Sequence, residues 1–77
     1  MSFEKVKEII VETINCDEDK VTMDANLRED LAIDSLDATE LGIAIEDNYN
    51  ATIEDDVMLG FVTVGDIVKY IDENIEG

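Results

Sequence analysis

The sequence of 77 residues contains no histidine, no proline and no tryptophan, and its single cysteine is Cys16. Without histidine, the commonest general base of enzymes is missing, so no Ser–His or Cys–His pair can activate a nucleophile. A single cysteine excludes an internal disulfide, and without histidine or a second cysteine there is no ordinary zinc site. We therefore predict that the chain is not an enzyme.

Positive charge is also scarce, because 5 Lys and Arg residues stand against 21 Asp and Glu residues, for a formal net charge of -16. Nucleic acids and anionic membrane surfaces both attract basic side chains, so neither is an expected partner. No apolar run is long enough to span a bilayer, and the charged N-terminus has no apolar signal segment. We expect a cytoplasmic protein that its own charge keeps monomeric.

The apolar fraction of 45% is typical of a globular protein, and the length suits one domain covering residues 1–77. Apolar residues follow the 3.6-residue period of a helix at residues 3–14 and 35–49, and again from residue 64 onward. Residues 53–59 can supply one or two further helical turns. The sequence thus predicts an all-α fold, a small four-helix bundle with three longer helices and one short one.

The apolar residues of the segment 15–34 follow no sustained period. We therefore predict a long loop there, between the first two helices. Loops of this length are usually functional or disordered. This one contains regularly spaced apolar residues that we expect to anchor it to the core: Val21, Leu27, Leu31 and Ile33.

The second predicted helix begins at an Asp-Ser-Leu triplet. Asp34 and Asp37 have the spacing of a capping box, which would leave the hydroxyl of Ser35 exposed on the first turn. A serine there is either a tolerated helix-start residue or a place of attachment, where a phosphoester would lie beside the positive end of the helix dipole. The core face of this helix is predicted to contain Leu36, Leu41, Ile45 and Tyr49.

Acidic residues crowd the same helix at Asp37, Glu40, Glu46 and Asp47. A charge run of this kind is usually a solvated face, but beside an attachment point it would also steer basic partners. The acidic stretch 17–28 lacks the oxygen ligand and the glycine of a helix–loop–helix calcium loop, so no metal site is predicted.

The segment Glu29-Asp30-Leu31-Ala32-Ile33-Asp34-Ser35-Leu36-Asp37 resembles the signature around the modified serine of acyl carrier proteins. The similarity continues through most of the chain, at Glu40-Leu41, Glu46-Asp47, Tyr49, Thr63-Val64 and Ile67-Val68-Lys69-Tyr70-Ile71.

The resemblance implies that a phosphopantetheinyl transferase attaches 4'-phosphopantetheine, taken from coenzyme A, to Ser35. Asp34 and Leu36 match positions of the family that orient this serine and contact the transferase. The arm would carry acyl groups as thioesters. The acidic helix, through Asp37, Glu40, Glu46 and Asp47, would dock on basic patches of acyl-transfer and chain-elongation enzymes. A carried chain that folds back between helices would be lined by Leu41, Ile45, Ile53, Ile67 and Ile71.

The chain also departs from the pattern of fatty-acid carriers. Thr39, Gly42 and Ile43 replace common residues of the second helix, and Ala32 replaces a glycine. These departures leave a polyketide, D-alanyl or aminoacyl carrier open beside an acyl carrier of fatty acid synthesis. An alternative of a different class is an acidic cation-binding or regulatory module whose Ser35 is never modified.

Overall fold

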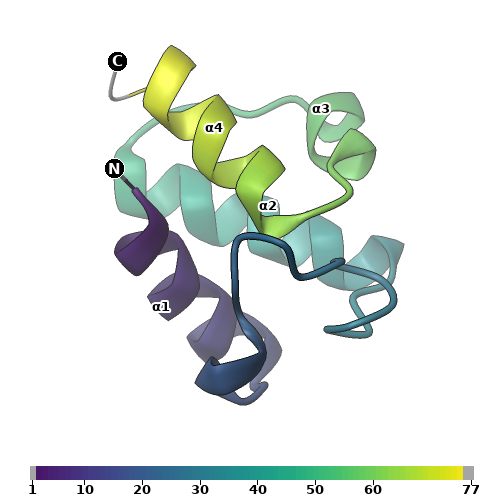
Figure 1. The fold of residues 1–77 in the computed structure, drawn as a ribbon. Helices are drawn as coiled ribbons and strands as arrows, with labels where there is room; N and C mark the ends of the chain where they lie inside the picture. Colours follow the sequence, from purple (N-terminus) through teal and green to yellow (C-terminus); the bar gives the residue numbers. More distant parts are fainter. Residues whose placement is uncertain (1, 76–77) are drawn as a thin grey trace.

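The structure is a computed structural model that describes residues 2–75, and it is built from helices (Figure 1). Between residues 2 and 75 there is no β-strand, only an isolated antiparallel bridge between Asn26 and Thr63. The predicted all-α bundle of three longer helices and one short helix is confirmed. Its elements are α1 (Phe3–Ile14), a 3-10 turn (Glu18–Lys20), α2 (Ser35–Tyr49), α3 (Asp55–Gly60) and α4 (Val64–Asn74).

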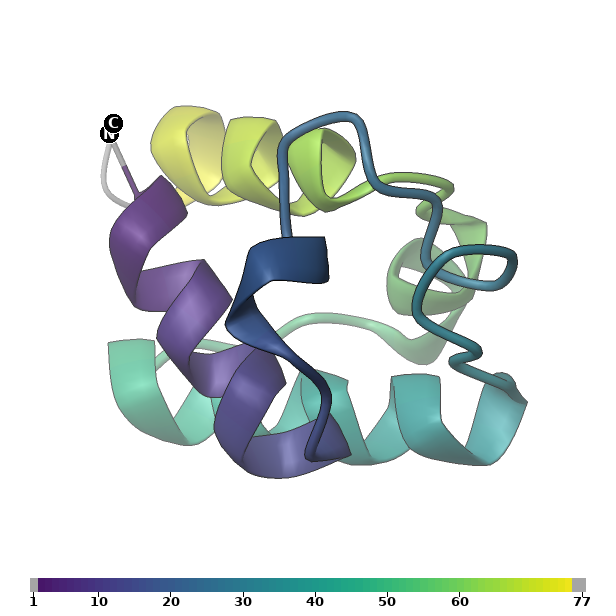
Figure 2. The same cartoon turned by 60° about the horizontal axis from the view of Figure 1, so that its bottom comes forward.

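The helices enclose a common interior. Figure 2 shows α4 above α2, with α1 crossing between them on one side and α3 on the other. The connection from α1 to α2 runs across the face that these helices leave open. None of the helices in the described part of the chain is long and apolar enough to cross a membrane.

Local sequence signals explain where the helices end. Asn15 and Asn50 follow α1 and α2 in the left-handed conformation, with φ of 62° and 51°, which asparagine tolerates better than most residues. Ser2 precedes α1, but its side chain does not cap the helix. Its hydroxyl instead donates to Asp72 Oδ1 at 2.6 Å, a bond that links the start of α1 to α4 and that no local pattern predicts.

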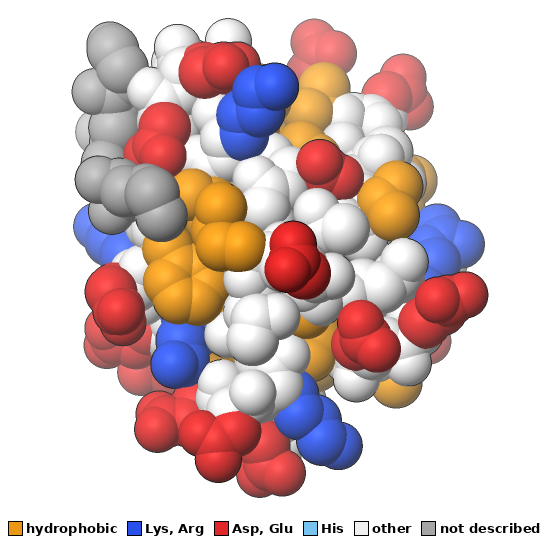
Figure 3. Space-filling model, viewed as in Figure 1, with side chains coloured by type: hydrophobic (Ala, Val, Ile, Leu, Met, Phe, Trp, Pro, Cys, Tyr) orange, Lys and Arg blue, Asp and Glu red, His pale blue; other side chains and the backbone are white. Residues whose placement is uncertain are grey.

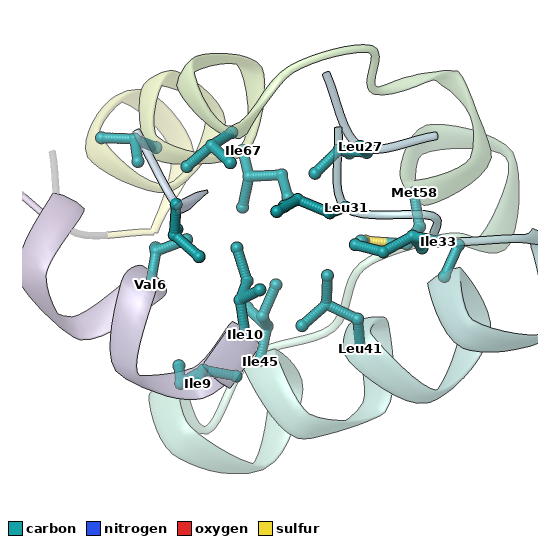
Figure 4. Close-up of a cluster of buried hydrophobic side chains, with 14 of the residues drawn as sticks. Val6, Ile9, Ile10, Leu27, Leu31, Ile33, Leu41, Ile45, Met58 and Ile67 are labelled. Atoms are coloured by element: carbon teal, nitrogen blue, oxygen red, sulfur yellow. The ribbon is translucent and has the colours of Figure 1, made fainter. Parts of the chain in front are cut away.

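The interior is a single cluster of apolar side chains from every helix (Figure 4). Val6 and Ile10 of α1, Ile45 of α2 and Ile67 of α4 are fully buried. Complete burial of such a side chain contributes roughly 1.5–3 kcal/mol, so this cluster dominates the stability of so small a protein.

The long connection is part of this core. All four predicted anchors, Val21, Leu27, Leu31 and Ile33, are buried, as is Ala25, which the apolar spacing did not single out.

The backbone of the connection also pairs with the start of α4: Val64 N donates to Ala25 O at 3.1 Å. Gly65 N donates to Met23 O at 2.9 Å, and a Cβ on Gly65 would lie 2.9 Å from that oxygen. Residue 65 must therefore be glycine for the two segments to approach this closely.

The start of α4 is a complete capping box. Thr63 Oγ1 accepts from Asp66 N at 3.2 Å, and Asp66 Oδ2 accepts from the backbone N–H groups of Val62 and Thr63 at 2.9 and 3.1 Å. These N–H groups hold the pKa of the Asp66 carboxyl below its usual value of 3.8, with a smaller contribution from the charge of Lys69. The ionised form of Asp66 thus favours the folded protein.

We predict that Asp66 stabilises the fold above about pH 4, where the carboxyl is ionised in both the folded and the unfolded chain. This contribution is lost as the pH falls through the lowered pKa of the folded state. Urea unfolding of the parent and of Asp66→Asn at several pH values below 5 should show a steeper loss of stability for the parent. A carboxyl of Asp66 that titrates at or above 3.8 in an NMR experiment would contradict this account.

Candidate functional site

Ser35 is the first residue of α2 and lies at the point where the chain leaves the core. Ile33 is buried, with an exposed fraction of 3%, whereas Asp34, Ser35 and Leu36 are exposed. Ile33 N donates to Leu27 O at 2.8 Å, which fixes the chain two residues before the serine. The serine is therefore exposed to solvent two residues after a residue that the core and a backbone hydrogen bond hold in place.

The turn before Ile33 requires an unusual backbone conformation. Ala32 has a φ of 55°, in the left-handed region that costs a residue with a Cβ about 1–2 kcal/mol relative to glycine. This conformation gives a physical reason for the glycine that the resemblance leads one to expect at this position.

The predicted capping box of α2 is present. Asp34 Oδ1 accepts from Asp37 N at 2.8 Å, and Asp34 N donates to Asp37 Oδ2 across 3.5 Å. The first helical hydrogen bond runs from Ala38 N to Asp34 O at 2.8 Å. The Ser35 hydroxyl therefore lies on a well-formed first turn of α2. This is the N-terminal end of the helix, where the helix dipole stabilises a negative charge.

The Asp34 carboxylate is oriented toward the helix by this bond to Asp37 N. The sequence contains no histidine that could serve as a base in its place. Ser35 is therefore an exposed hydroxyl on the first turn of α2 without a histidine to activate it as a nucleophile.

The opposite faces of α2 have different roles. Its buried residues are Ala38, Leu41, Gly42 and Ile45. Leu36 lies about 200° around the helix from Ala38, since each residue advances about 100°. The prediction that Leu36 belongs to the core face was wrong, because 68% of its surface is exposed.

Ile43 is exposed on the same outward face, with an exposed fraction of 53%. Leu36, Glu40, Ile43 and Asp47 have i, i+4, i+7 and i+11 spacing and form one stripe along α2, which we call the α2 stripe. Ile43 was not predicted to be a surface residue, although its position three residues after the acidic Glu40 was a usable signal.

The four predicted docking acids do not have equivalent surroundings. Glu40 and Asp47 are exposed, Asp37 is half-buried in the capping box, and Glu46 is half-buried. The Glu46 carboxylate accepts from Ile53 N at 2.8 Å, so it holds the connection between α2 and α3. Figure 3 shows one face of the whole molecule, and Asp and Glu side chains are spread over all of that face.

The residues predicted to line an acyl pocket lie together in the core. Leu41 and Ile45 of α2 and Ile67 and Ile71 of α4 are completely buried, and Ile53 has an exposed fraction of 6%.

In residues 2–75, no group of three or more Cys, Asp or Glu side chains is arranged to hold a metal ion.

Comparison with known proteins identifies the family of the chain. Residues 4–71 match the family described as "Phosphopantetheine attachment site". A protein of Clostridium perfringens (strain 13 / Type A) named "Acyl carrier protein" is 45% identical over 74 residues, which cover 96% of this chain and 97% of that protein.

A second relative shows the same degree of similarity. The "Acyl carrier protein" of Petrotoga mobilis (strain DSM 10674 / SJ95) is 45% identical over 73 residues, or 95% of this chain and 86% of that protein. The cofactor that this family implies is covalent 4'-phosphopantetheine, and such proteins carry acyl groups rather than catalyse reactions. The chain belongs to the acyl carrier protein family.

Proposed function

We propose that residues 1–77 form one carrier domain whose 4'-phosphopantetheine is attached to Ser35. Its role would be to shuttle acyl intermediates between enzymes of fatty acid or related acyl biosynthesis. The observation that carries the proposal is the position of Ser35, exposed on the first turn of α2 two residues after the buried Ile33. The cytoplasmic location and the monomeric state expected from the sequence remain predictions.

The residues present fit the group. A phosphodiester on Ser35 Oγ would adjoin the first-turn N–H groups of α2, which lack partners inside the helix. Asp34 and Asp37 are both committed to the capping box, which keeps this end of the helix formed. Leu36 is exposed beside the serine, where a transferase can contact it.

The reaction at Ser35 depends on the modifying enzyme. The sequence has no histidine, and in this proposal the transferase supplies the base that takes the Ser35 proton. When bound, the prosthetic group supplies a terminal thiol that holds an acyl group as a thioester. Ser35 anchors that thiol to the protein and thereby raises its effective concentration at each docked enzyme.

The α2 stripe supplies the docking surface in this proposal. Glu40 and Asp47 provide negative charge that attracts basic patches of the transferase and of acyl-transfer and chain-elongation enzymes. Leu36 and Ile43 add exposed apolar surface between these charges. Asp37 and Glu46 lie at the edges of this surface and are also bonded to the backbone of the fold.

The attachment site is tested by intact mass after incubation with coenzyme A and a broad-specificity phosphopantetheinyl transferase. We predict one phosphopantetheine adduct on the parent and none on Ser35→Ala. The variant should stay folded, with its free energy of unfolding within about 0.5 kcal/mol of the parent, because the changed side chain is exposed.

An adduct on Ser35→Ala would place the attachment elsewhere. A folded parent that gains no mass would support the alternative of an acidic module with an unmodified serine.

The docking surface is tested by charge reversal. We predict that Glu40→Lys/Asp47→Lys lowers the rate of association with the transferase roughly 10-fold or more at low salt, and that it flattens the salt dependence of that rate. Stopped-flow measurements over a range of ionic strength provide the readout.

The matched control is Glu12→Lys/Glu73→Lys, which makes the same change in net charge at exposed positions of α1 and α4. Equal effects of the two double variants would mean that net charge, and not the α2 stripe, sets the rate.

A further inference from the structure

Gly42 leaves a notch in the buried face of α2, which we call the Gly42 notch. A Cβ built on Gly42 would lie 3.1 Å from Met58 Cγ and 3.5 Å from Met58 Sδ, so the Met58 side chain of α3 fills this notch. Met58 has an exposed fraction of 3%, and Figure 4 shows it directed from α3 toward Leu41 and Ile33. A glycine inside a helix destabilises that helix relative to alanine. In return, the Gly42 notch lets the Met58 side chain approach the backbone of α2.

The Gly42 notch lies on the same side of α2 as the proposed attachment point. Ser35, Thr39, Gly42 and Glu46 have i, i+4, i+7 and i+11 spacing, so they form a second stripe beside the α2 stripe. Ser35 and Thr39 are exposed, whereas Gly42 is buried. The helix rises about 10.5 Å from Ser35 to Gly42, a distance that a phosphopantetheine arm with its phosphate and two amide units can cover. On this side of α2, the Gly42 notch is therefore the first buried position that the arm meets.

The path from Ser35 to the notch suits an apolar group. Thr39 is the residue between them on this stripe, and its Oγ1 already donates to Ser35 O at 3.0 Å. The first charged residue of the stripe is Glu46, beyond Gly42, and its carboxylate accepts from Ile53 N at 2.8 Å. An apolar chain that follows this path to the notch consequently removes no carboxylate of the stripe from water.

The helix that supplies Met58 is the least secured of the four. Of the six residues of α3, all within the described part of the chain, Met58 alone is buried, whereas α2 and α4 each bury four residues. The residue before α3, Glu54, makes no side-chain cap. So short a helix depends on packing rather than on its own propensity, and the unbranched methionine side chain adapts easily to a new position. The Met58 side chain can therefore leave the Gly42 notch while α2 and α4 stay in place.

We infer that Met58 and the Gly42 notch determine which acyl chains the protein takes in. Met58 closes the notch in the free protein, and an apolar chain on the Ser35 arm enters there by displacing the Met58 side chain. The inference rests on the proposed function and deepens it by naming the residue pair that selects the cargo. An unbranched apolar chain can replace a thioether side chain in the notch, whereas an aminoacyl group would bring a charged amine into it without a partner.

The first test follows the contact between Met58 and Gly42 in the full chain by NMR. A phosphopantetheinyl transferase loads the protein from coenzyme A or from hexanoyl-coenzyme A, and intact mass establishes that loading has occurred. With the unacylated arm, we expect NOEs between the Met58 side chain and Gly42 Hα. With the hexanoyl arm, these NOEs should be lost and replaced by NOEs from the acyl chain to Gly42 Hα.

Persistence of the NOEs between Met58 and Gly42 in the hexanoyl-loaded protein would overturn the inference and leave the proposed function intact. Failure to load from either coenzyme A compound would overturn the proposed function and the inference together.

The second test measures how well the protein shields the thioester. Met58→Ala removes the side chain that closes the notch and leaves a cavity that the chain can fill, so hydroxylamine should cleave the hexanoyl thioester roughly 3-fold or more slowly than in the parent. An acetyl thioester has almost no chain to bury and should be cleaved at nearly the same rate in both proteins.

Met23→Ala is the matched control, because it makes the same change at a methionine with an exposed fraction of 37%. It should cleave like the parent with both thioesters. Equal rates of hexanoyl cleavage in Met58→Ala and Met23→Ala would contradict the assignment of Met58. The NOE test uses the parent protein, so it decides the question even where Met58→Ala does not fold.

Discussion

The burial of Ile33 one residue before the cap of α2 is the constraint on which the site depends. Ile33 is held by the core and by its hydrogen bond to Leu27 O, so the next residues must emerge in one direction. Asp34 then begins the helix through its bond to Asp37 N, and Ser35 follows on the surface. The proposed attachment point, Ser35, therefore leaves the core at a position that the anchored loop determines.

The helix that follows serves the fold and the surface at the same time. Its inner face is small or aliphatic and packs against α1 and α3, while its outer face presents Leu36, Glu40, Ile43 and Asp47. The far end of the helix is secured without using this outer face. The Nζ atom of Lys5 in α1 lies 4.4 Å from the centroid of the Tyr49 ring, and it also donates a hydrogen bond to Asn48 O at 3.3 Å. A basic side chain, scarce in this sequence, is thus used to join two helices.

Features that depend on neighbours in the sequence were predictable. The helices, both capping boxes and the anchors of the long loop follow from periodicity and spacing within a few residues. Features that depend on distant partners were not predictable in this way. Leu36 was assigned to the core because it is apolar, although its angle around the helix turns it outward. The bond from Ser2 to Asp72 and that from Ile53 N to Glu46 join groups whose proximity arises only in the folded chain.

Amide hydrogen exchange of the free protein tests the central claim that the loop holds the proposed attachment point, Ser35, in place. The account predicts slow exchange at Ile33 N–H, close to that of the core amides of α4, and measurable protection at Asp37 N–H, because both groups are hydrogen-bonded at the start of α2. Exchange of Ile33 N–H at the rate of an unstructured peptide, with the core of α4 still protected, would contradict it.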